Sequence, residues 1–241
     1  MKRVLITVVL IALFPVLSFS QAAASFHVFP QVADGVSADG SYYYQSILIT
    51  TAVTAESTTC KFKITGPSTT RVLAGGEFNL QGVGAVSILP TFGNLFSLAS
   101  GYGTLTCNQP VSAVLAYLSI NLAADIPTAG AAVFSSPPVL RAQLVLNQTV
   151  AKTGVAIAND TDNAATYTLT LKNQNNQPVA TGTVTVQAHS SVAKFADELI
   201  SIPKDFVGAI LVSSSGSATF SIIGLSYIGN AFLTQPAAVL P

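Results

Sequence analysis

A segment of this chain recurs 105 positions further along the sequence. Residues 103–120 align with residues 208–225 without a gap. A repeat of this size is typical of one β unit present twice, and less so of a single enzyme domain folded around one cleft. The duplication therefore favours a structural or binding function over catalysis.

Further segments align in pieces, and the alignment predicts where the two copies meet. The offsets between matched segments drift between 103 and 108, as expected when loops absorb insertions. The sequence SSPP at 135–138 has the composition of a semi-rigid linker. We expect repeat 1 at 25–137 and repeat 2 at 138–241. The matched segments are 47–51 with 155–159, 60–64 with 167–171, and 86–92 with 189–195.

Apolar and polar residues alternate with a period of two along most of the chain, as at 43–51, 166–172 and 207–213. No segment after the N-terminus shows a sustained helical period, although 197–200 could form a short helical turn. We predict an all-β fold of two tandem antiparallel β-sandwich domains, immunoglobulin-like or jelly-roll-like. A unit of about 105 residues suits a sandwich of seven to nine strands. One continuous sandwich built from both copies is the alternative.

The N-terminus has the pattern of a secretory signal. Lys2 and Arg3 precede an apolar run at 4–17, and small residues at 22–24 offer a cleavage site. We therefore expect a signal peptide at 1–24 and a secreted, extracellular or cell-surface location, with the periplasm as a further possibility. An uncleaved membrane anchor is the alternative.

Charged residues make up only 8% of the chain, against about 25% in ordinary soluble domains. Removal of Lys2 and Arg3 would leave 10 − 2 = 8 Lys+Arg against 10 Asp+Glu. This weakly negative balance gives no electrostatic reason to expect binding to nucleic acid or to an anionic membrane. We expect no cofactor, and membrane contact only through the signal peptide.

The chain has two cysteines, Cys60 and Cys107. Each alternates in phase with apolar residues of its own strand, so both thiols are expected on an apolar face. An even count in a secreted chain favours a disulfide. The alignment places Tyr167 and Val212 at the matching positions of repeat 2, so we expect the bond to cross the core of repeat 1. Two separate buried thiols are the alternative.

Few residues could carry catalysis. His27 and His189 are the only histidines, and His189 lies in an expected turn beside serines. The segment 160–163 offers oxygen ligands that could suit calcium, and Asp197 with Glu198 could form a carboxylate pair. Repeat 1 has other residues at the positions of these groups. We therefore predict a non-enzyme with no catalytic residue and no metal site.

Tyr42, Tyr43 and Tyr44 form the one aromatic cluster in the sequence. Because strand side chains alternate, Tyr42 and Tyr44 should share one face, where flat rings with wet hydroxyls could stack against sugars. We name Tyr42 and Tyr44 as candidate ligand-binding residues. The alternative is that Tyr43 packs in the core while its neighbours cover the sheet.

Several framework motifs resemble uncharacterised secreted β-sandwich repeat proteins of acidobacteria and related soil bacteria. The matching segments are FPQVADG at 29–35, TGVAIAN at 153–159, FVGAILVS at 206–213 and FLTQP at 232–236. The chain departs from the pattern after residue 35, where tyrosines replace glycines and a Trp. The resemblance implies secretion and a β-sandwich fold, and it transfers no catalytic residue.

These observations predict a non-catalytic secreted or cell-surface module with a structural or adhesive role. A carbohydrate-binding protein that uses an exposed tyrosine face is the second hypothesis. The expected partner is an extracellular polysaccharide or another surface protein.

Overall fold

The structure is a computed structural model that describes residues 23–66, 77–81, 85–88, 98–228 and 231–241. The predicted signal peptide therefore lies almost entirely outside the described residues, as does most of segment 86–92. Among the helices of the described part, none is long and apolar enough to cross a membrane.

The all-β prediction is confirmed, because all but one of the described elements are strands. The exception is the expected helical turn, α1 (Ala196–Leu199). The N-terminal half holds β1 (Ala24–Val36), β2 (Tyr42–Ala52), β3 (Thr58–Thr65), β4 (Glu77–Leu80), β5 (Ala85–Ile88), β6 (Ala99–Asn121) and β7 (Ile126–Phe134). The C-terminal half holds β8 (Arg141–Asn147), β9 (Lys152–Asn159), β10 (Ala165–Asn173), β11 (Pro178–Val186), β12 (Ser190–Phe195), β13 (Val207–Ser214), β14 (Ser221–Ile228), β15 (Ala231–Pro236) and β16 (Ala238–Val239).

The long strand β6 organises the N-terminal half by belonging to two strand layers. Its first part pairs with β1 and β3, and its second part pairs with β2 and β7. All of these pairings are antiparallel. All seven strands form one sheet, in which β1 also pairs with the start of β2. Within this sheet, β6 is shared by two local orders, β4-β3-β6-β1 and β5-β2-β6-β7.

The C-terminal half has two separate antiparallel sheets, whose orders correspond to these two local orders with β16 as an additional strand. They run β11-β10-β13-β8-β16 and β12-β9-β14-β15. The position that β6 occupies in both orders of the N-terminal half is occupied in the C-terminal half by two strands, β13 in one sheet and β14 in the other. Apolar residues of both sheets, such as Leu144, Ile157 and Leu169, are fully buried in one core cluster.

The difference between β6 and the β13–β14 pair is explained by local sequence. Ladder pairing with β3 ends at Cys107 and pairing with β2 begins at Val111. Pro110, which lacks an N–H, lies in the gap between these ladders, where no hydrogen bond is lost. The aligned part of repeat 2 is serine- and glycine-rich, and there the chain leaves the sheets at 215–219.

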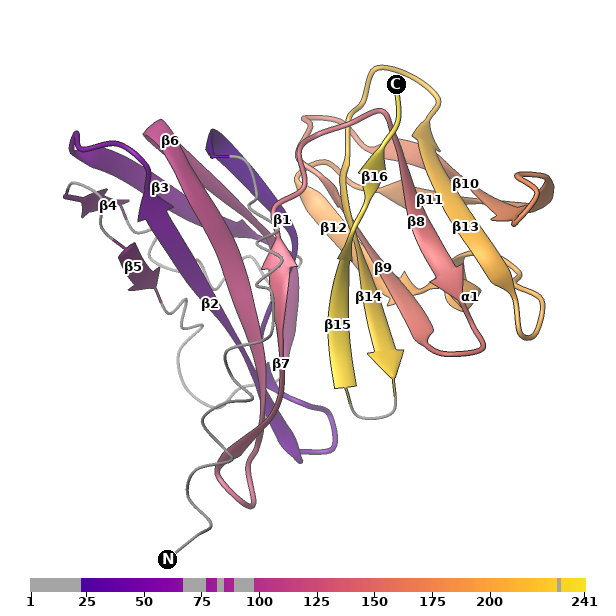
Figure 1. Cartoon of the computed structure of the whole chain (residues 1–241), viewed down its shortest axis with the longest axis horizontal. Coiled ribbons are helices and arrows are strands. Elements are labelled where there is room, and N and C mark those ends of the chain that lie inside the picture. Colours follow the sequence, from indigo (N-terminus) through magenta and orange to yellow (C-terminus); the bar gives the residue numbers. More distant parts are fainter. Residues whose placement is uncertain (1–22, 67–76, 82–84, 89–97, 229–230) are drawn as a thin grey trace, which may run out of the picture.

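The two halves lie side by side (Figure 1). Ala156, Ile223 and Leu225 of the C-terminal half belong to the same core cluster as Phe29 and Leu115 of the N-terminal half. The predicted linker is held on both sides. The Ser136 N–H donates to the carbonyl of Val28, and the Ser136 hydroxyl accepts from the N–H of Ile222.

Candidate functional site

A groove of about 850 Å³ lies between the two halves. Its walls come from β1, β2, β6 and β7 on one side and from β9, β12, α1 and β14 on the other. The aromatic side chains that line it are Tyr42, Tyr44, Tyr117, Phe195 and Tyr227. The polar ones are Gln31, Ser100, Ser119, Thr128, Lys194 and Glu198.

Strand alternation places the tyrosines of the N-terminal half in this groove. Tyr42 and Tyr44 lie an even number of positions before Leu48, so their side chains point to the same face of β2. Leu48 is fully buried on this inner face. Tyr117 follows Leu115 in the same way on β6. The rings of Tyr44 and Tyr117 stack with centroids 5.7 Å apart. The groove is therefore a continuation of the inner face of this sheet beyond its core.

The opposite wall is a second aromatic surface. The Phe195 and Tyr227 rings meet edge to face at 5.6 Å. The Lys152 ammonium lies 3.9 Å from the Phe195 ring centroid and 3.6 Å from the Asp197 carboxylate. Gly154 of β9, which pairs with Phe195 of β12 and with Leu225 of β14, also lines the groove.

A β-bulge directs a polar side chain into the groove. The β1–β6 register shifts between Phe29 and Val32, around Pro30 and Gln31. Bulges often turn a side chain toward a functional site, and proline is tolerated there because its missing N–H is not needed. Gln31 lines the groove as a result.

The groove is weakly charged. Burial raises the pKa of Tyr117, with further contributions from the nearby Tyr227 and Tyr44. Burial likewise raises the pKa of Tyr227, and Tyr44 adds to the effect. Both phenols are therefore neutral at physiological pH. Lys194 and Glu198 are the charged residues of the lining, and Glu198 also accepts a 2.7 Å hydrogen bond from the Phe195 N–H.

The structure brings Tyr42 and Tyr44 together on one face, as expected, but places them in a groove rather than on an open surface. Both are half-buried. Tyr43 lies on the other face, where its hydroxyl donates a 2.9 Å hydrogen bond to Asp34. All three tyrosines are half-buried, Tyr42 and Tyr44 on the groove side of the strand and Tyr43 on the opposite side.

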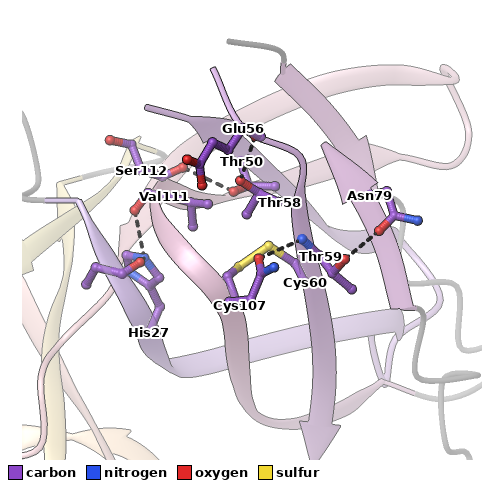
Figure 2. Close-up of a disulfide and its surroundings, with 12 residues drawn as sticks. His27, Thr50, Glu56, Thr58, Thr59, Cys60, Asn79, Cys107, Val111 and Ser112 are labelled. Carbon is purple, nitrogen blue, oxygen red and sulfur yellow. Dashed lines mark hydrogen bonds between the residues drawn. A yellow bond between two sulfur atoms is a disulfide. The ribbon is translucent and has the colours of Figure 1, made fainter. Parts of the chain in front are cut away.

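Cys60 and Cys107 form the predicted disulfide, with Cα atoms 4.1 Å apart (Figure 2). The expectation that it crosses the core was wrong, because the bond joins neighbouring strands of one sheet. Cys60 pairs directly with Cys107 in the β3–β6 ladder. In the C-terminal half Val212 pairs with Leu169, two residues beyond the Tyr167 that the sequence alignment chose.

His27 is almost completely buried, which the sequence did not indicate. Its Nε2 lies 3.0 Å from the carbonyl oxygens of both Ala24 and Val111, so Nε2 carries the proton. Nδ1 then accepts from the Ser135 hydroxyl at 2.9 Å. Burial lowers the pKa of His27, against the raising effect of the two carbonyls. This histidine ties β1 to β6 and to the linker.

His189 lies on a turn with φ of 47° and is 46% exposed. Its Nε2 is 3.0 Å from Asp162, and its Nδ1 is 3.7 Å from Asp160. Asp160 also accepts a 2.5 Å hydrogen bond from the buried Tyr102 of the N-terminal half. These groups link the halves at the surface. In the described part of the chain, no cluster of three or more His, Cys, Asp or Glu side chains could hold a metal ion.

The other candidates for chemistry have structural partners. Asp197 pairs with Lys152, and Glu198 closes the first turn of α1. Immediately before the segment 160–163, Asn159 is fully buried, and its amide donates to three backbone carbonyls.

Sequence reasoning missed Tyr117, Phe195 and Tyr227. The parity of Tyr117 with Leu115 predicts an inner face, yet an inner face normally means core. Only the placement of the C-terminal half makes that face one wall of a groove. Phe195 and Tyr227 carry no cluster signal, because they lie 32 positions apart in the sequence, on β12 and β14.

No protein-family model matches the chain, and no curated protein matches it. Among solved structures, it is similar to a protein of Parabacteroides distasonis named as secreted, at 13% identity, over 87% of this chain and 85% of that one, with a TM-score of 0.24. It is also similar to β-glucuronidase 2 of Bacteroides uniformis, at 9% identity and a TM-score of 0.21, covering 83% of this chain and 26% of that chain. TM-scores this low do not define a shared fold.

Proposed function

We propose that this chain is a secreted, non-catalytic adhesive module that binds carbohydrate in the groove between two copies of one β-sandwich unit. The duplication is supported by the aligned segments and by the matching strand orders of the two halves. Export is supported by the N-terminal pattern and by the disulfide, since disulfides persist in oxidising compartments.

The aromatic lining of the groove is the observation that carries the proposal. Tyr42 and Tyr44 present rings from one wall, and Phe195 and Tyr227 present rings from the other. A pyranose ring has apolar C–H faces that pack on aromatic rings and hydroxyls that bond to polar side chains at its edge. Gln31, Ser119 and Thr128 offer such polar partners. The lining carries one basic and one acidic residue, Lys194 and Glu198, and this balance of charge favours a neutral polysaccharide.

Binding to a glycan array and to insoluble polysaccharides tests this function. We expect the wild-type protein to bind at least one neutral glycan and the Tyr42→Ala/Tyr44→Ala double variant to lose that binding. Tyr43→Phe is the matched control, because Tyr43 is on the same strand but faces away from the groove. Binding that survives the double variant, or no binding to any neutral glycan, would contradict the proposal.

A further inference from the structure

The strand β11 is an outer strand of the five-stranded sheet and has an unusual composition for that position. It is nine residues long and contains no charged side chain. Its ladder with β10 runs without interruption from Val186 to Ala180. In the part of the chain that the structure describes, β11 pairs with β10 and with no other strand. One row of its backbone N–H and C=O groups therefore faces outward.

Other outer strands carry the features that normally prevent edge-to-edge pairing, namely shortness, charge or cover. The strand β16 has two residues, and β4 has four with Glu77 paired to Lys61. The strand β12 includes Lys194. The strand β15 lies against β7, where the Thr234 hydroxyl donates to the carbonyl of Ala132. The strand β11 begins with Pro178 and a register irregularity beside it, and α1 and Ile200 lie against Gly182 on the side that Ala180 and Val184 share. Its ladder from Ala180 to Val186 is nevertheless long, regular and uncharged.

The side chains of β11 alternate between the core and the outer face of the sheet. Ala180 and Val184 pack against the core cluster of the C-terminal half. On the other face, Thr181, Thr183 and Thr185 lie opposite Thr170, Thr168 and Thr166 of β10. The Thr166 and Thr185 hydroxyls are 2.8 Å apart. Threonine is β-branched and stiff, so little side-chain freedom would be lost on pairing.

We propose that β11 pairs antiparallel with β11 of a second copy of this chain, around a two-fold axis at Gly182. In this arrangement the threonine face of one copy continues into the threonine face of the other. The inward-facing apolar residues of the two copies likewise lie on one side of the joined sheet. Because β11 has no charged side chain, pairing with a second β11 brings no like charges together. It also offers no charge that would favour a charged peptide as the partner instead. The inference does not depend on the proposed function, although a dimer would carry two grooves and gain avidity.

Sedimentation analysis of the secreted protein over a wide concentration range tests the pairing. We expect a monomer–dimer equilibrium. In the proposed register Thr181 of one copy faces Thr183 of the other, so the Thr181→Lys/Thr183→Lys variant sets lysine against lysine. We expect this variant to weaken dimerisation at least about tenfold. The matched control is Thr168→Lys/Thr170→Lys, which adds the same charges to the same face one strand further in.

Hydrogen exchange of the peptide 178–186 gives a second measurement that needs no substitution. We expect its outward amides to become more protected as the concentration of wild-type protein rises. A protein that is monomeric at every concentration would overturn the proposal. So would a dimer that the edge variant leaves intact, a control variant that dissociates equally, or exchange in 178–186 that is independent of concentration.

Discussion

At the scale of single residues, the two histidines have different roles that their sequence context does not reveal. His27 is 2% exposed and bonded through both ring nitrogens, whereas His189 lies at the surface between two carboxylates. Buried polar groups that lose a partner cost far more than exposed ion pairs.

We therefore expect His27→Ala to lower the free energy of unfolding by about 2–4 kcal/mol, because it removes buried volume and the hydrogen bonds of the ring to Val111 and Ser135. His189→Ala is the control, with an expected loss within about 1 kcal/mol. Urea denaturation at neutral pH measures both. Equal losses for the two variants would contradict this assignment of roles.

Asp34 is a buried carboxyl whose Oδ1 accepts from Tyr43 while Oδ2 has no partner among the described residues. Burial raises its pKa from 3.8 to about 6, against the lowering effect of the Tyr43 hydrogen bond. Because the folded-state pKa is the higher one, folding favours the protonated form. The stabilisation from this group is complete below pH 3.8 and is lost as the pH rises through about 6.

We expect Asp34→Asn, which stays neutral, to raise the free energy of unfolding at pH 7.5 by about 1–3 kcal/mol relative to wild type. The difference between variant and wild type should shrink toward pH 4. Urea denaturation across this range measures it. A difference that does not vary with pH would show that Asp34 titrates normally in the folded protein.

At the scale of elements, the disulfide fastens β3 to the first part of β6. It closes a loop with a sequence separation of 47 residues, for which chain entropy predicts about 3–4 kcal/mol. We expect Cys60→Ala/Cys107→Ala to lower the free energy of unfolding by that amount, and reductant to have the same effect on wild type but none on the variant. Two thiols that react in unfolded, unreduced protein would contradict the bond.

Much at this scale could be predicted from the sequence, because alternation and turn residues are local signals. The strands at 43–51, 166–172 and 207–213 were expected where β2, β10 and β13 lie, and so was α1. Register was harder. The alignment matched Cys60 with Tyr167 although the ladder matches it with Leu169, since both are apolar and share parity. Alternation shows to which face of the sheet a side chain points, but it does not distinguish two alignments that differ by two residues.

At the scale of the whole molecule, the candidate site was predicted only in part. That Tyr42 and Tyr44 share one face follows from their spacing in the sequence. The aromatic residues opposite them, Phe195 and Tyr227, are brought there by the packing of the two halves. Leu225 joins the core cluster of the N-terminal half and also lines the groove. No pattern in one strand specifies such a contact, so the second aromatic wall was not predicted.

The central claim is that one ligand contacts both halves in the groove. The most direct test is calorimetric titration of a soluble oligosaccharide, taken from the glycan that binds best, into wild type, Tyr44→Ala, Phe195→Ala and the Tyr43→Phe control. A stacked aromatic contact on each wall predicts that Tyr44→Ala and Phe195→Ala each weaken binding about tenfold, while Tyr43→Phe binds like wild type. Wild-type affinity in either wall variant would contradict a site shared by the two halves.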